Sequence, residues 1–225
     1  MKNKEFADVL KEHLDFWPHL TPEQVKMILD HTKLMHYAAG ETIHSAEHEC
    51  IGVLIVKSGE LRTYMLSEEG REITLYRLNG GEVCILSASC ILHSITFNVY
   101  IDAEKGSDVL LLNASVFSNI ASQNLYVENF ALRAGVERFS DVMWAMEQIL
   151  FMNFDRRLAI FLITETARIK SDNLPLTHEQ IAKYMGSARE VVSRMLKHFS
   201  SEGIVSLYRG GVRILDRTKL KSLIS

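Results

Sequence analysis

The chain has 225 residues, 47% of them hydrophobic and 24% charged, and a net charge of -3, which is an ordinary globular composition and argues against disorder. No apolar run approaches the roughly 20 residues that a membrane-spanning helix needs, and the first ten residues lack the apolar core of a secretory signal. We therefore expect a cytoplasmic protein with no membrane partner.

Short helices are predicted at the amino end, and short strands follow them. Residues 5–31 carry amphipathic helical patterns, with Thr21 placed to cap a helix that starts at Pro22. After Tyr37, glycines recur among runs rich in β-forming residues. These runs are 53–56, 73–76, 95–101 and 109–112. They predict an all-β unit, a small barrel or roll, in which residues 95–103 alternate as in a strand with one buried face.

A long helix is predicted from about residue 125. Its apolar residues alternate at spacings of four and three, which is the heptad pattern of a coiled coil. The seam consists of Leu132, Val136, Phe139, Met143, Met146 and Leu150. Leu125 extends it by one heptad, with Asn129 at a seam position where a polar residue specifies pairing register. We expect a homodimer through this seam in preference to a helix packed on its own domain.

The carboxyl-terminal part of the chain is basic. Of the 25 Lys+Arg and 28 Asp+Glu, 13 and 7 lie in residues 153–225, a net of +6, which leaves 12 and 21, a net of -9, in residues 1–152. The basic end is the candidate for phosphate contact, although a solvated face explains the charge equally well. We predict a sensor domain at 1–123, a dimerisation helix at 124–152 and a small basic domain at 153–225.

Residues 176–196 carry the pattern of a helix-turn-helix. Thr177 is placed to cap the first helix and Ser187 the second, while Gly186 supplies the turn. The small core between the helices is predicted to contain Ile181, Ala182, Met185, Val192 and Met195. After the second helix, Gly203 ends the helical pattern, and 204–207 with 212–215 predict a β-hairpin wing that carries Arg209 at its tip.

The second helix exposes side chains that suit DNA. Arg189, Glu190, Ser193 and Arg194 lie near its amino end, the part that enters the major groove in this motif. Arginine can donate twice to guanine and glutamate can accept from cytosine, whereas an exposed Arg/Glu pair without a ligand contributes little to stability. The predicted contacts with double-stranded DNA are Thr177, Ser187, Arg189, Glu190, Ser193, Arg194, Lys197 and Arg209.

Four segments carry a resemblance to a known family. They are Ser58-Gly59-Glu60-Leu61-Arg62, Gly70-Arg71-Glu72-Ile73-Thr74-Leu75, Arg157-Leu158-Ala159 and Arg189-Glu190-x-x-Ser193-Arg194. With them the chain resembles the CRP/FNR regulators, named after the cyclic-AMP receptor protein and the fumarate-nitrate reduction regulator. The resemblance covers nearly the whole length and implies an α+β fold: an amino-terminal antiparallel β-roll of the cupin-like jelly-roll type, a long dimerisation helix and a carboxyl-terminal winged helix-turn-helix.

The resemblance also implies a function. It predicts a transcription regulator that binds a palindrome with TGA-containing half-sites, read by Glu190 and Arg194, while Arg189 and Ser193 tune the flanking bases. RNA polymerase is the expected further partner if the protein is an activator. Two-fold pairing would place the recognition helices about 34 Å apart, one turn of DNA.

The sensor departs from the cyclic-nucleotide members that it resembles. Those members carry a phosphate cassette with an arginine, whereas residues 80–90 here contain none and the next arginine along the chain is Arg133. A buried cyclic phosphate without such a donor is poorly compensated, so cyclic AMP is disfavoured. The effector, a small molecule or a redox signal, is otherwise unknown. The candidate effector residues are Glu82, Cys84, Ser87, Ser89 and Cys90.

The three cysteines do not form a standard metal pattern. The amino-terminal cluster of the oxygen-sensing members is absent, because no cysteine precedes Cys50. Cys50, Cys84, Cys90 and His93 are candidates for an iron-sulfur cluster, another metal or redox thiols, but small buried core residues are the preferred interpretation of the cysteines. For His44 and His48, before Cys50, a polar loop with solvated histidines is preferred to a metal site.

Two other functions compete with DNA binding. One is a signalling module that binds a small molecule and acts through protein contacts; a steep salt dependence on a palindromic duplex distinguishes DNA binding from it. The other is an enzyme with Cys84 or Cys90 as nucleophile and His93 as base. We do not expect an enzyme, because no third orienting residue or oxyanion-stabilising turn accompanies these residues.

Overall fold

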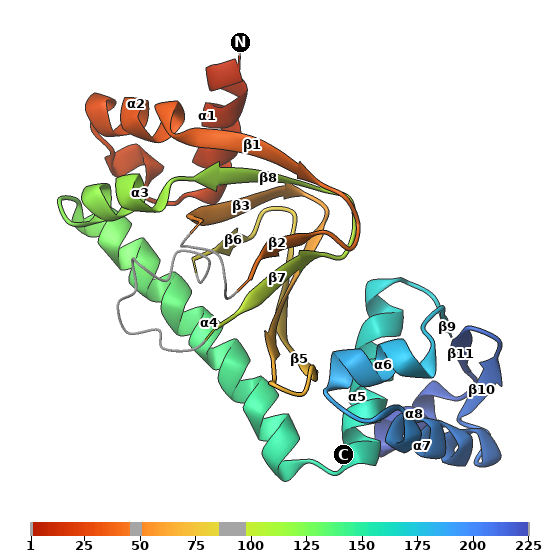
Figure 1. Cartoon of the computed structure of the whole chain (residues 1–225). Coiled ribbons are helices and arrows are strands. Elements are labelled where there is room, and N and C mark those ends of the chain that lie inside the picture. Colours follow the sequence, from red (N-terminus) through yellow and green to blue (C-terminus); the bar gives the residue numbers. More distant parts are fainter. Residues whose placement is uncertain (1, 46–50, 86–97, 225) are drawn as a thin grey trace. The chain divides into compact units, whose positions relative to one another are not determined.

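The computed structural model describes residues 2–45, 51–85 and 98–224, and Figure 1 shows the order of the elements along the chain. The chain divides into two compact units. The β-roll unit comprises Met1–Met65 and Leu75–Val142, and the winged-helix unit comprises Leu66–Thr74 and Met143–Ser225. Within the described ranges, no helix is both long enough and apolar enough to cross a bilayer.

Short helices occupy the amino end, as the sequence predicts. They are α1 (Lys2–His13), the 3-10 helix η1 (Trp17–His19) and α2 (Pro22–Asp30). Thr21 caps α2 through a capping box, because its hydroxyl accepts from the Gln24 amide while the Gln24 side chain accepts from the Thr21 amide. A further helix, α3 (Ala114–Ala121), follows the last strand of the roll and is capped by Asn113.

Two four-stranded sheets form the roll, and their strands are antiparallel in each pair whose register is defined. The first sheet has the order β1 (Thr32–Tyr37), β8 (Ser107–Leu112), β3 (Val53–Ser58), β6 (Val83–Cys84). The second has the order β2 (Thr42–His44), β7 (Tyr100–Ala103), β4 (Glu60–Leu66), β5 (Glu72–Asn79). The predicted β-roll is therefore confirmed.

Strands β3 and β8 separate two hydrophobic cores. In β3, Val53 and Ile55 pack in a core with the amino-terminal helices, whereas Leu54 and Val56 pack in the interior of the roll. Successive side chains of a strand point to opposite faces, so a strand buried on both faces is apolar throughout. In β7, Ile101 and Ala103 are buried, as the predicted alternation requires. The predicted strand over 95–101 lies partly outside the described residues.

The long helix α4 (Leu125–Phe151) is present as predicted. One side of it is buried through Val127, Ala131 and Ala145. A second helix, α5 (Phe154–Arg168), follows and buries Leu158, Leu162 and Thr166.

The remaining elements build the winged helix around a single core. They are β9 (Asn173–Leu174), α6 (His178–Met185), α7 (Arg189–Ser201), β10 (Val205–Tyr208), β11 (Gly211–Ile214) and α8 (Arg217–Ser222). The three strands form an antiparallel sheet in the order β10-β11-β9. The wing strands begin and end one residue away from the predicted limits, and α7 with this hairpin confirms the winged helix-turn-helix fold.

Candidate DNA-binding surface

Helix α6 owes both of its ends to local sequence. The Gln180 amide donates to the Thr177 hydroxyl at 3.2 Å and the Thr177 amide donates to Gln180 Oε1 at 2.8 Å, which completes a capping box. The helix ends at Gly186, whose φ of 62° lies in the left-handed region that favours glycine. The predicted cap at Thr177 and the turn at Gly186 are both confirmed.

Helix α7 begins one residue later than predicted. Its N-cap is Ala188, which has no side-chain oxygen to accept from the first turn, so the prediction of Ser187 as the cap is wrong. Ser187 instead belongs to the turn, where its amide donates to the carbonyl of Ala182 at 3.0 Å. The turn includes two residues after Gly186, Ser187 and Ala188. The prediction chose Ser187 because serine is a favoured N-cap residue.

The two helices cross over a small apolar core. Ile181, Val192 and Leu196 are fully buried, and Met185 is nearly so. Met195, a predicted core residue, is only partly buried, because the adjacent Leu196 occupies the inward position of the helix.

Arg157 holds the carboxyl end of α6 in place. The sequence analysis included Arg157 only as part of a segment that resembles the family, and it did not predict this role. Its Nη2 donates to the carbonyl of Met185 at 2.8 Å, which satisfies one of the carbonyls left unpaired at a helix end. Burial lowers the pKa of Arg157, because desolvation disfavours the charged form. Helix α5 thus positions the turn from which α7 starts.

The predicted DNA contacts lie on the surface of the winged-helix unit. Arg189, Glu190, Arg194 and Lys197 are exposed on α7. Glu190, Arg194 and Lys197 follow one another at spacings of four and three residues and therefore share a side of the helix, and Arg189 precedes them at its first position. Ser193 and Ser187 are partly exposed, and Thr177 and Arg209 are exposed. Arg189 Nε lies 3.8 Å from Glu179 Oε2, a solvent-exposed pair of little energetic weight.

The wing tip carries Arg209 between the two hairpin strands. Gly210 has a φ of 89°, and a Cβ on Gly211 would lie 2.2 Å from the Tyr208 ring. The Tyr208 hydroxyl donates to the carbonyl of Leu174 at 3.3 Å, which holds the ring over the hairpin. The glycine pair therefore permits the tight tip that the sequence predicted.

One stripe of α4 is apolar and exposed in the single chain. The exposed fractions are Leu132 56%, Val136 65%, Phe139 63%, Met143 45%, Met146 45% and Leu150 64%, the six residues of the predicted seam. Leu125 is also exposed, and so is Asn129 at the intervening position.

Only part of the predicted effector and metal set can be placed. Ser87, Ser89, Cys90, Cys50, His93 and His48 lie outside the described residues. Cys84 is fully buried, with its Sγ 3.9 Å from the Tyr76 hydroxyl, and burial raises the pKa of Tyr76 well above its usual value. His44 is buried on β2, so the prediction of a solvated histidine is wrong at this position. Across residues 2–45, 51–85 and 98–224, no three His, Cys, Asp or Glu residues gather as metal ligands would.

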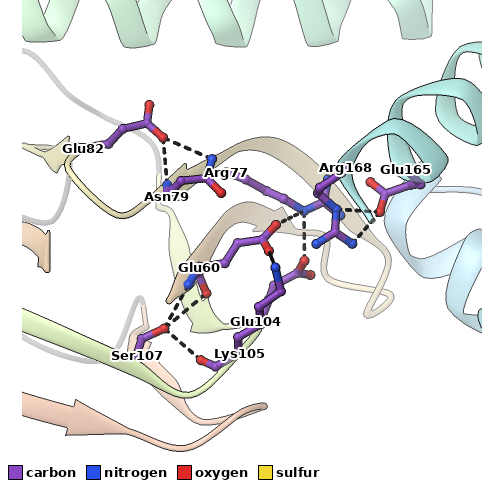
Figure 2. Close-up of polar contacts among 9 residues, drawn as sticks. All are labelled: Glu60, Arg77, Asn79, Glu82, Glu104, Lys105, Ser107, Glu165 and Arg168. Carbon is purple, nitrogen blue, oxygen red and sulfur yellow. Dashed lines mark hydrogen bonds and ion pairs between the residues drawn. The ribbon is translucent and has the colours of Figure 1, made fainter. Parts of the chain in front are cut away.

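A link between the roll and α4 runs through Arg138. Its guanidinium lies 4.9 Å from the centroid of the Tyr76 ring, its Nη2 lies 3.8 Å from Glu82 Oε1, and its Nη1 donates to Asp141 at 2.8 Å. Glu82 in turn accepts from the Asn79 amide at 2.7 Å (Figure 2). Glu82, a predicted effector residue, is thus joined to the long helix by a cation.

A second polar group of the roll is buried and fully ion-paired. Glu60 is 1% exposed, and its carboxylate lies 2.5 Å from Lys105 Nζ and 3.7 Å from Arg77 Nε. Arg77 also pairs with Glu104 at 2.9 Å, so that two acids and two cations alternate in Figure 2. Ser107 accepts from the Glu60 amide, which ties β4 to β8.

An antiparallel roll, a long helix with an exposed apolar stripe and a winged helix with exposed basic side chains together define a class of regulators that bind DNA under the control of a sensor. Residues 34–124 match the cyclic nucleotide-binding domain family, and residues 156–223 match the Crp-like helix-turn-helix domain family. The chain is 45% identical to a transcriptional regulator of the crp/fnr family from Eubacterium rectale, with a TM-score of 0.91 over 94% of this chain and 98% of that one. The chain belongs to the CRP/FNR family of transcription regulators, which is not a family of enzymes.

More distant relatives include a transcriptional activator and a cyclic AMP receptor protein. The transcriptional activator protein anr of Pseudomonas aeruginosa is 26% identical over 179 residues, which cover 76% of this chain and 72% of that protein. The cyclic AMP receptor protein of Thermus thermophilus is 23% identical over 205 residues, or 91% and 94% of the two chains.

Proposed function

We propose that this regulator binds, as a homodimer, a palindromic operator with TGA-containing half-sites, and that an effector in the β-roll controls its affinity for DNA. The observation that carries the proposal is the exposure of Arg189, Glu190 and Arg194 on one side of α7. This side is free in the winged-helix unit to present arginine donors and a glutamate acceptor to base edges. Ser193, Ser187, Thr177, Lys197 and Arg209 supply further contacts to bases or phosphates.

The homodimer is supported by the exposed apolar stripe of α4. Phe139, Val136 and Leu150 each leave more than 60% of their surface in water, and an apolar patch of this extent marks an interaction site. Because the stripe follows the heptad, a second copy of the same helix covers it knob into hole. The pair then presents two recognition helices at a spacing near the 34 Å of one DNA turn.

The effector is proposed to act through Arg138. This cation contacts both Tyr76 and Glu82 of the roll, and its Nε is buried without a hydrogen-bond partner among the described residues. A ligand with an acceptor group satisfies that donor and thereby changes how α4 is held, which is the differential interaction that control requires. The Thermus relative is named for cyclic AMP, but residues 80–90 of this chain lack an arginine to pair its phosphate, so cyclic AMP remains disfavoured here.

Two partners remain candidates. An iron-sulfur cluster or another metal at Cys50, Cys84, Cys90 and His93 is tested by metal and absorbance analysis of protein purified without oxygen. The Pseudomonas relative is named as a transcriptional activator. If this chain also activates transcription, RNA polymerase is its expected partner.

The test of the proposed function uses a duplex that the full chain selects from a random pool. We expect the selected sequence to be a palindrome, the affinity to fall steeply with salt, and a duplex with one half-site scrambled to bind far more weakly. Phe139→Glu places a charge in the seam and should give a monomer by sedimentation, with a loss of affinity for the palindrome.

Gln148→Glu is the matched control, because position 148 lies on the side of α4 away from the seam and should leave a dimer. Selection of no sequence, or a salt-insensitive affinity, would contradict DNA binding. A Phe139→Glu variant that remains dimeric would contradict pairing through the seam and would leave DNA binding unaffected.

A further inference from the structure

A hollow of about 410 Å³ lies on the DNA-binding side of the winged-helix unit. Residues 177–179 at the start of α6 form one wall, Arg189 at the start of α7 forms the second, and Tyr208, Gly210 and Gly211 of the wing form the third. Three elements of the motif therefore meet around one space that opens to solvent. The space lies beside Arg189, which the proposed function assigns to DNA.

His178 is a titratable side chain of this hollow that was not among the DNA contacts predicted from the sequence. It is partly buried, and the positive charges of Arg189 and Lys197 act on it from α7. The other ionisable groups of the lining are Glu179 and Tyr208. Burial first, and the charges of Arg189 and Lys197 next, lower the pKa of His178 below its ordinary 6.5. The imidazole of the free protein is therefore neutral at physiological pH.

A DNA phosphate reverses this electrostatic balance. The phosphate carries one negative charge per nucleotide, and it is attracted by Arg189 and Lys197, the same cations that oppose protonation of His178. Once the phosphate lies among them, it cancels their repulsion and itself favours the imidazolium, which is a charge-assisted donor to phosphate oxygen.

We propose that the hollow between α6, α7 and the wing receives a phosphate of the DNA backbone, and that His178 takes up a proton when the phosphate enters. This inference rests on the proposed function and deepens it: affinity for DNA rises as the pH falls. By linkage, each histidine that gains a full proton changes the dissociation constant by at most about tenfold per pH unit, and a dimer has two such histidines. The contact is with the backbone, so the effect is the same for every duplex sequence.

The test measures the dissociation constant of the full chain for its selected duplex from about pH 6 to about pH 8.5 at fixed ionic strength. We expect the wild type to bind about fivefold or more tighter at the acidic end. His178→Gln should bind with little dependence on pH and should match the wild type at the basic end. His178→Arg should bind tightly at every pH, because its charge is permanent.

His198→Gln is the matched control, since His198 is an exposed histidine of α7 outside the lining of the hollow, and it should behave as the wild type. Two further readings separate a phosphate contact from a structural role. At acidic pH, the slope of log affinity against log salt concentration should be steeper for the wild type than for His178→Gln by about 0.9 per histidine. Calorimetry in buffers of different ionisation heat should report proton uptake on DNA binding only in the wild type and the control.

The outcomes distinguish the inference from the proposal on which it rests. Absence of binding to any duplex at any pH would overturn DNA binding and the phosphate site together. Binding by the wild type and His178→Gln with the same pH dependence and the same salt slope would overturn the phosphate site alone. Circular dichroism of each variant across the same pH range confirms that the compared proteins are folded.

Discussion

In the β-roll unit, Glu60 is almost completely buried and is surrounded by Lys105 and Arg77, while in the winged-helix unit Arg189, Glu190 and Arg194 stand exposed along one side of α7. A buried carboxylate costs solvation free energy that its own cations must offset, so such a cluster belongs to the fold. An exposed row has no such cost, and its charges remain available to a partner. Substitution therefore separates the two: loss of a buried charge should reduce stability, and loss of an exposed one should reduce binding.

The largest expected effect is on DNA affinity. Arg194→Ala removes the base contact that we propose in each half-site, worth about 1–3 kcal/mol apiece, so the dissociation constant should rise by about 30-fold or more. Because Arg194 is exposed, the free energy of unfolding should stay within about 0.5 kcal/mol of the wild type. Fluorescence anisotropy and urea denaturation measure the two quantities, and Lys221→Ala in α8 is the control. A large loss of stability in Arg194→Ala would contradict the distinction between buried charges that stabilise the fold and exposed charges that bind a partner.

The converse substitution is Glu60→Ala. It leaves Lys105 and Arg77 without the buried carboxylate and should reduce the free energy of unfolding by about 2–4 kcal/mol. The loss is moderated because Lys105 is largely solvent-exposed and Arg77 keeps Glu104. Glu69→Ala is the control, because its carboxylate is exposed and its pair with Arg71 contributes little. Equal stability of the two variants would show that the buried cluster is dispensable.

A smaller effect is expected at Thr177, which caps α6 and is also one of the predicted DNA contacts. Thr177→Ala removes the cap of α6 and should reduce the free energy of unfolding by about 1 kcal/mol. Thr177→Ser keeps the hydroxyl oxygen and should restore most of the loss. If Thr177→Ser were as unstable as Thr177→Ala, the capping hydrogen bond would not be the cause.

The smallest effect concerns acid. The pKa of His178 is lowered in the folded protein, so the unfolded chain binds the proton more readily. The stability linked to this histidine is present above its unfolded pKa near 6.5 and decreases as the pH falls below that value. Thermal unfolding between about pH 5 and pH 8 should therefore show a weaker acid dependence in His178→Gln than in the wild type. Stability and DNA affinity then respond to acid with opposite signs, and a shared sign would contradict this account.

The winged helix was predictable because its signals are local. The capping pair Thr177 and Gln180 and the turn glycine Gly186 lie within ten residues, and each determines a backbone conformation by itself. The error at Ser187 has the same origin: local preference cannot decide between adjacent residues when tertiary packing sets the length of the turn.

The contacts of the roll could not be predicted in the same way. Glu60 forms ion pairs with Arg77 and Lys105 only after the strands of the roll have paired, and no spacing in the sequence predicts these contacts. Arg138 likewise gives no sign in the heptad pattern that it contacts Tyr76. The pattern predicts which face of a helix is apolar, whereas the partner of a single polar residue depends on the assembled fold.

The hydrogen bond from Arg157 to the carbonyl of Met185 has a mechanical consequence. It ties helix α5 to the turn that precedes α7, so that α5, α6 and α7 are joined by a polar contact as well as by their shared core. In the homodimer that we propose, a signal in the β-roll then has no need to change the structure of the winged helix, and it has only to alter the distance and angle between the two recognition helices.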